Sequence, residues 1–236
     1  MQWNEEYLST IFGEDTKRDI FKKNSDEIEM KFEWVKKFPA EERSKLIFGA
    51  VFETLAVSEN LENHPENDIQ KKMRGLIQEL YQKAEITLGE KWPSKPDFVS
   101  VIFDKDGHLV IDEILEMKTS VTALEHGINK KQSQPQNSIQ TIERIVDLIN
   151  TMINASDISQ IGLINKLQGK YDNYRKSFLK DTFRRIKELG LSKNITFSQD
   201  LQYHVVLPAG ETGNIPKFEV THDNKPIRAT ITSSRF

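Results

Sequence analysis

The stretch that decides the fold is KPDFVSVIFDKDGHLVIDEILEMKTS, residues 95–120. Its first apolar run, residues 98–103, is rich in β-branched and aromatic side chains, and its second, residues 109–117, carries apolar residues through its length. Both runs favour β-strands. Between them, Asp104-Lys105-Asp106-Gly107 includes the glycine that a tight hairpin turn needs at positive φ. We therefore predict an antiparallel β-hairpin.

Charged side chains at the open end of this hairpin are predicted to meet. Side chains alternate along a strand, so Glu116 and Lys118 project from one face. Asp97 begins the partner strand after Pro96, and a proline is tolerated at a strand's start because its missing N–H is not needed there. We expect two carboxylates and an ammonium in one small volume. The alternatives are that Glu116 and Lys118 are solvated charges on an edge strand and that Asp97 is a turn residue.

The segments Pro96-Asp97 and Glu116-Met117-Lys118 resemble the signature of the PD-(D/E)xK phosphodiesterase superfamily, the restriction-endonuclease-like nucleases. The resemblance covers roughly the middle half of the chain. It implies an α/β (α+β) fold with a restriction-endonuclease-like core, in which a mixed central β-sheet is flanked by helices, and an N-terminal helical extension is added here. It also implies that Asp97, Glu116 and Lys118 are catalytic in the hydrolysis of DNA, as an endonuclease or exonuclease.

The resemblance also implies a metal site. Asp97 and Glu116, with the main-chain carbonyl of Met117, would bind Mg²⁺ or Mn²⁺. In this superfamily a helix before the catalytic hairpin often supplies a further acid, and Glu53 is the best candidate. It lies on an apolar helical stripe with Leu46, Gly49, Ala50 and Val57. A glutamate there is costly unless it is paired, protonated or bound to a cation, or unless it reaches solvent at the edge of the stripe. Gly49 would permit close approach of this helix.

The composition limits the kinds of functional site that the chain can form. The chain has no cysteine, which excludes disulfides, thiolate zinc sites, a cysteine nucleophile and the cysteine-bound iron–sulfur cluster of some RecB-type nucleases. The five histidines lack metal-ligand spacing such as HxxxH, so carboxylate ligands and a hard cation remain. A net charge of -3 does not announce a nucleic-acid binder, although binding depends on where the positive charge lies.

The 236 residues are expected to form a single nuclease-like domain, with a mainly helical part over residues 1–90 and a sheet-containing core over residues 91–236. The N-terminus lacks the features of a signal peptide, and no apolar run approaches the length of a membrane span. We therefore expect a soluble, cytoplasmic protein without a membrane partner. DNA is the expected partner, with RNA left open, and the oligomeric state is also open, a homodimer included.

Helices and strands are predicted on both sides of the hairpin. Helical patterns cover residues 4–37, a segment opened by Pro39, residues 68–86, a segment capped by Asn137 or Ser138, and residues 158–189 with a break near Gly169. Polar connections are predicted at residues 58–67 and from residue 121 to a loop at 132–136. A further strand at residues 201–207 and a closing hairpin built from 217–220 and 227–232 complete the pattern.

Two helical segments offer candidate substrate contacts. Gln140 and Arg144 lie one turn apart and could contact phosphate, but RecB-type members carry a Gln-x-x-x-Tyr signature, and here the tyrosine is missing. Residues 170–187 interleave seven basic residues with aromatics, which makes Arg175 and Lys176 candidates for nucleic-acid contact. The favoured alternative is that the aromatics belong to the core and the basic residues form a solvated helix face.

Two other functions compete with the nuclease. One is a noncatalytic nucleic-acid-binding or assembly module on the same fold. The other is a mainly helical interaction protein with a small sheet and no site.

Overall fold

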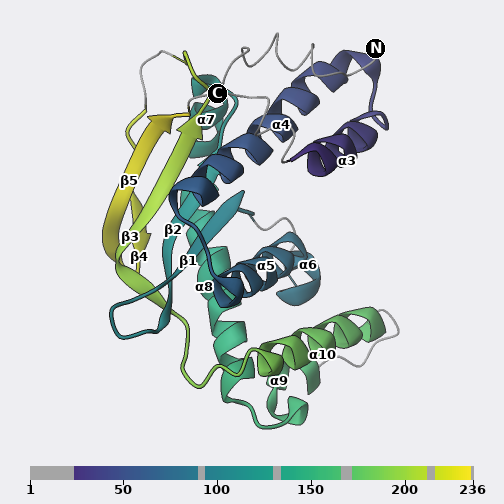
Figure 1. The fold of residues 1–236 in the computed structure, drawn as a ribbon, viewed down its shortest axis with the longest axis vertical. Helices are drawn as coiled ribbons and strands as arrows, with labels where there is room; N and C mark the ends of the chain where they lie inside the picture. Colours follow the sequence, from purple (N-terminus) through teal and green to yellow (C-terminus); the bar gives the residue numbers. More distant parts are fainter. Residues whose placement is uncertain (1–23, 90–93, 130–133, 166–171, 212–215, 235–236) are drawn as a thin grey trace.

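The computed structural model describes residues 24–89, 94–129, 134–165, 172–211 and 216–234 (Figure 1). The strands are β1 (Phe98–Phe103), β2 (Leu109–Met117), β3 (Thr196–Leu207), β4 (Val220–His222) and β5 (Lys225–Ser233). The helices are α3 (Ser25–Val35), α4 (Ala40–Asn63), α5 (Asp68–Gln82), α6 (Ala84–Thr87), α7 (Val121–Ile128), α8 (Gln134–Asn154), the 3₁₀ turn η1 (Ile158–Gln160), α9 (Gly162–Asn165) and α10 (Asp172–Glu188).

The strands form one five-stranded mixed sheet in the order β1-β2-β3-β5-β4. The two outer pairs, β1–β2 and β4–β5, are antiparallel, whereas β3 runs parallel to both β2 and β5. Helices flank the sheet (Figure 1). The predicted mixed α/β fold is therefore confirmed at this level. Within the ranges given above, no helix is both long and apolar enough to cross a membrane.

The predicted hairpin forms with both strands at the predicted bounds. Gly107 has φ +75°, a conformation that a glycine adopts without the steric cost of a Cβ. Asp104 closes the turn, because its Oδ1 accepts hydrogen bonds from the backbone N–H groups of Asp106 and His108 at 2.9 and 2.8 Å. The local sequence therefore fixes this element.

The two faces of the sheet support two hydrophobic cores, because neighbouring side chains of a strand point to opposite faces. Ile114 of β2 and Tyr203 of β3 pack into the core that contains α5, α8 and α10. The next residue of β2, Leu115, packs with Met117 into the second core, which α3 and α4 cover. The sheet is thus held between α8 on one face and α4 on the other.

Helix α4 begins after Pro39 as predicted, but it continues to Asn63. The expectation that residues 58–63 are a polar connection is therefore wrong. Of the polar side chains that suggested a connection, Glu62 and Asn63 are exposed and Ser58 is buried, while the apolar stripe through Ile47, Val51 and Leu55 is buried and continues toward Leu61. A helix can carry such residues when one face remains apolar.

Helix α5 begins with a capping box. The side chain of Asn67 accepts hydrogen bonds from the N–H groups of Ile69 and Gln70, both at 3.0 Å. In turn, the Gln70 Oε1 accepts a hydrogen bond from the Asn67 N–H at 3.0 Å. The helix ends at Gln82 and α6 follows, so the single helix predicted to residue 86 is divided.

This cap gives a stability prediction. Asn67→Ala is expected to lower the free energy of unfolding by about 1 kcal/mol, because the first-turn N–H groups lose their acceptor. Urea unfolding followed by circular dichroism measures the change. Lys71→Ala, an exposed change in the same helix, serves as the control and should stay within about 0.5 kcal/mol of the wild type. Equal unfolding midpoints for Asn67→Ala and the control would contradict the role of the cap.

Two predictions after the hairpin are wrong. Residues 121–128 form α7 instead of a polar connection, because Ser120 accepts from the Ala123 N–H at 3.1 Å and Leu124 is buried. Helix α8 begins at Gln134, three or four residues before the predicted cap. Pro135 fits its first turn, where a missing N–H costs nothing. The remaining loop residues, 132 and 133, and the predicted break at Gly169 lie outside the described residues.

The predicted strand at residues 201–207 forms as part of β3, which is longer because it begins at Thr196. The closing hairpin forms as β4 and β5, but its first strand is shifted: β4 shares only Val220 with the predicted residues 217–220, and β5 begins at Lys225 instead of residue 227. The turn is shorter than predicted because Asp223 and Asn224, at φ 51° and 60°, reverse the chain.

Candidate functional site

Three of the predicted catalytic residues come together where β1 begins and β2 ends. The register pairs Phe98 with Leu115, so Asp97, just before β1, lies beside the last residues of β2. Its Oδ2 accepts a hydrogen bond from the Met117 N–H at 2.6 Å. Lys118 Nζ is 2.5 Å from Glu116 Oε1. The hairpin thus places two carboxylates and one ammonium at one end of the sheet.

Glu53 of α4 joins this group through its charge. Burial is the main cause that raises the pKa of Asp97 well above its ordinary value, and the negative charges of Glu116 and Glu53 raise it further. The pKa of Glu116 is also raised, chiefly by burial, while Lys118 opposes the shift. Glu53 is itself partly exposed, and Lys31 Nζ lies 3.5 Å from its Oε2.

Gly49 of α4 faces the chain just after the hairpin. A Cβ placed on Gly49 would lie 3.4 Å from Thr119 Cγ2, one residue after Lys118, which is an ordinary contact distance. The helix that carries Glu53 therefore runs directly beside the end of the segment that carries Glu116 and Lys118.

Glu116 has two further partners that the sequence did not single out. It is 2% exposed; Gln134 Nε2 donates to its Oε1 at 2.6 Å, and the Tyr203 hydroxyl donates to its Oε2 at 3.3 Å. Burial and the charge of Glu116 raise the pKa of Tyr203 well above its ordinary value, so the phenol stays neutral and remains a donor. Two features of the sequence could have pointed to these partners. Pro135 suits a first helical turn, which puts Gln134 at the start of α8, and the alternation along β3 turns Tyr203 and Val205 to one face.

The backbone of Met117 also faces the acids. The N–H and C=O of one strand residue point to the same side, so the Met117 carbonyl is directed, like its N–H, toward the side of β1. The pairing of β1 with β2 ends at Phe98 and Leu115, and just before it the Asp97 N–H donates to the Leu115 carbonyl at 3.1 Å. Pro96, the residue before Asp97, has no N–H to donate.

Taken together, the group offers oxygen atoms to a cation. The half-buried Asp97 and the buried Glu116 face one nearby lysine, and their raised pKa values indicate that two negative charges are unfavourable there without further positive charge. Carboxylate and carbonyl oxygens are the ligands that Mg²⁺ and Mn²⁺ prefer. The residues present therefore fit a divalent ion.

The four predicted substrate contacts are not gathered at this site. Gln140 and Arg144 are exposed on α8, beyond the Gln134 that reaches Glu116. Arg175 donates to the Thr87 carbonyl at 3.3 Å, which uses its guanidinium within the fold. Lys176 is half-buried on α10, at the opposite end of the molecule from α4 (Figure 1).

The favoured alternative predicted that the aromatic residues of residues 170–187 belong to the core. The structure confirms this only in part. Tyr174 is 60% exposed, whereas Phe178 packs against the core and Ile186 is buried. Tyr171 lies outside the described residues.

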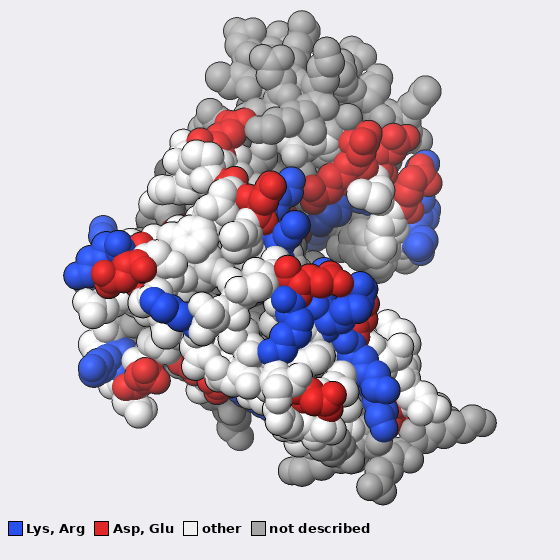
Figure 2. Space-filling view, turned by 60° about the horizontal axis from the view of Figure 1, so that its bottom comes forward, with Lys and Arg blue, Asp and Glu red and all other residues white. Residues whose placement is uncertain are grey.

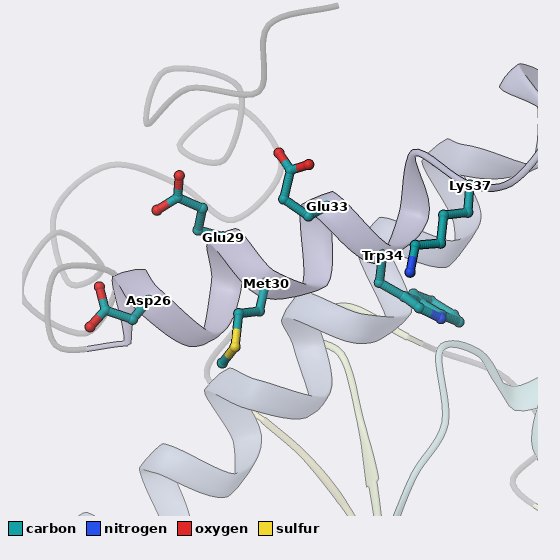
Figure 3. A pocket seen from close by; sticks show the side chains of 6 residues that line it. All are labelled: Asp26, Glu29, Met30, Glu33, Trp34 and Lys37. Carbon is teal, nitrogen blue, oxygen red and sulfur yellow. The ribbon is translucent and has the colours of Figure 1, made fainter.

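Two surface hollows differ in their charge. One follows α3, where the exposed Met30 and Trp34 are accompanied by acids (Figure 3); its lining is Asp26, Glu29, Met30, Glu33, Trp34 and Lys37. The other, of about 600 Å³, lies between α5 and α10 and is lined by the basic residues Lys71, Lys72 and Arg185 together with the acids Asp68 and Glu188. Figure 2 turns the lower end of Figure 1 toward the viewer. On this face, lysine and arginine side chains gather with acids between them.

Three comparisons with known proteins, against family models, curated sequences and solved structures, found no significant match to this chain.

Proposed function

We propose that the chain is a metal-dependent phosphodiesterase that hydrolyses DNA, with a restriction-endonuclease-like core. The observation that carries the proposal is the convergence of Glu53, Asp97, Glu116 and Lys118 at one end of the sheet. The mixed sheet flanked by helices supports the proposed core. Mg²⁺ or Mn²⁺ is the proposed cofactor.

The roles of the residues follow from their positions. Asp97 and Glu116 would hold the ion, with the Met117 carbonyl and Glu53 as further oxygen ligands. When bound, such an ion lowers the pKa of a water molecule and neutralises charge on the phosphate. Lys118, 2.5 Å from Glu116, is placed to orient the attacking water or to stabilise the charge that develops on the phosphate.

Charge distribution favours one side for the substrate. The acids on α3 would repel a phosphate backbone, whereas Lys71 and Lys72 near the start of α5 would attract it. The other end of α5 reaches the site, because the Tyr81 hydroxyl donates to the Asp97 carbonyl at 3.3 Å. DNA lying along α5 would therefore pass from the basic hollow to the acids.

One observation favours the noncatalytic nucleic-acid-binding or assembly module. Glu116 Oε1 already accepts from Lys118 and Gln134, and Oε2 accepts from Tyr203. An ion bound to Glu116 must displace or share these donors. A module without catalytic activity would simply keep them.

Cleavage of plasmid and linear DNA separates the two functions. We expect cleavage with Mg²⁺ or Mn²⁺, none with EDTA, and loss of activity in Glu116→Gln, which keeps the shape of the side chain and removes its charge. DNA binding by Glu116→Gln, measured by fluorescence anisotropy at several salt concentrations, should persist. Salt-sensitive binding without cleavage under either ion would contradict the nuclease and support the noncatalytic module.

A further inference from the structure

His222 ends β4, where the short β4–β5 hairpin packs against α8. Its Nδ1 lies 2.6 Å from Glu143 Oε1 of α8. The ring also packs on Phe197 of β3, with ring centroids 4.3 Å apart, and the side chain is only 17% exposed. Contacts from two other elements therefore fix the orientation of this imidazole. The same hairpin is held to α8 by Gln136, whose side chain bonds both the N–H and the carbonyl of Thr221 at 2.9 Å.

The second ring nitrogen faces an acceptor. A nitrogen 2.6 Å from a carboxylate oxygen carries the hydrogen, so a neutral His222 has its lone pair on Nε2. Nε2 lies 3.6 Å from Asp223 Oδ2, farther than a hydrogen bond. A lone pair and a carboxylate oxygen repel each other unless a group between them satisfies both. That group is a second proton on the ring, a water molecule that donates to both, or a metal ion.

The spacing suits a metal ion. One potential ligand atom from each of Glu143, His222 and Asp223 lies within 4.8 Å of those of the other two. Two donors bound to one ion at about 2.1 Å are roughly 3.0 to 3.4 Å apart at octahedral or tetrahedral angles. The gap of 3.6 Å between Nε2 and Oδ2 is close to this width. Small rotations of the exposed Asp223 side chain would close the difference.

We propose that His222 Nε2 and the Asp223 carboxylate bind a first-row transition-metal ion such as Zn²⁺ or Ni²⁺, with Glu143 orienting the ring. A carboxylate on the far nitrogen is the usual partner of a metal-bound imidazole, because it fixes the tautomer and raises the basicity of the ligand. Imidazole prefers such ions to Mg²⁺, so this site differs in chemistry from the all-oxygen group at Asp97 and Glu116. The 82% exposure of Asp223 leaves room for water to complete the coordination.

The site would link two elements far apart in the sequence. Glu143 belongs to α8, and His222 and Asp223 belong to the β4–β5 hairpin at the edge of the sheet (Figure 1). An ion that binds only the folded arrangement stabilises it in proportion to its concentration and affinity. The inference is independent of the proposed nuclease, because it uses other residues and another class of ion.

Calorimetric titration and thermal unfolding of the full chain, freed of metal with EDTA and then dialysed, test the site. We expect Zn²⁺ or Ni²⁺ to raise the melting temperature of the wild type. The affinity of this binding step should fall at least about tenfold in Asp223→Asn, whose exposed position does not endanger the fold. His222→Gln should lose the step. Mg²⁺ at the same concentration should not raise the melting temperature by an amount that depends on His222.

His126→Gln is the matched control, since His126 is an exposed histidine on α7. It should titrate like the wild type. Equal Zn²⁺ and Ni²⁺ affinities in the wild type, Asp223→Asn and His222→Gln, or no binding of either ion, would show that His222 and Asp223 do not form a metal site and would overturn the proposal.

Discussion

Lys118→Ala is expected to lower the rate of DNA cleavage by about a hundredfold or more, equivalent to about 2.7 kcal/mol at the barrier. The Lys118 side chain is 15% exposed and its ammonium is 2.5 Å from Glu116, so the charge acts in a poorly solvated place where a single charge has a large effect. Single-turnover cleavage of labelled linear DNA with Mg²⁺ or Mn²⁺ measures this change separately from DNA binding, which should change much less.

A matched control lies on the same hairpin. Lys105 is exposed in the turn at the other end of the two strands, and Lys105→Ala should cleave like the wild type. Circular dichroism shows whether Lys118→Ala remains folded. A folded Lys118→Ala that cleaves at the rate of Lys105→Ala would remove the lysine from the proposed mechanism.

Asp97→Asn is expected to abolish metal-dependent cleavage and, in the same variant, to stabilise the metal-free fold at neutral pH by about 1 kcal/mol or more. Asparagine can still accept the hydrogen bond from the Met117 N–H, but it removes a poorly solvated charge that is repelled by Glu116 and Glu53. A purely structural aspartate would show the opposite sign in stability, because its loss would remove a favourable interaction.

The dependence of stability on pH tests the predicted effect of Asp97 in a second way. The folded state holds a proton on Asp97 more tightly than the unfolded chain does, because the pKa of Asp97 is raised on folding. In EDTA, the contribution of Asp97 to stability is therefore present below the unfolded pKa of about 3.9 and is lost as pH rises through the raised folded pKa. Urea unfolding at a series of pH values should show this loss in the wild type and a smaller one in Asp97→Asn.

Asp106→Asn, an exposed change in the hairpin turn, is the control for both measurements and should keep activity and the wild-type pH profile. If Asp97→Asn is less stable than the wild type at neutral pH in EDTA, Asp97 stabilises the fold as a charged group, and the case for an ion at this position fails.

The sequence alone determined the parts of this protein that depend on neighbouring residues. Alternating apolar runs and Gly107 predicted the hairpin, and the same alternation, with the register of a short turn, brought Asp97 beside Glu116 and Lys118. Helical periodicity put Glu53 on the correct helix. Polar surface residues misled the prediction at the end of α4 and at α7, because the pattern of one buried face continues there under polar neighbours.

Only the tertiary structure decided the partners that complete these groups. Gln134 and Tyr203 reach Glu116 from 18 and 87 residues away, and Glu143 meets His222 across 79 residues. No local period records such contacts, because they depend on how α8 packs on the sheet and on which strand lies beside β2. The spacing of the histidines did not reveal the contact of His222 with Glu143 for the same reason: the carboxylate lies on α8 and the ring on β4, so only the packing of these elements brings them together.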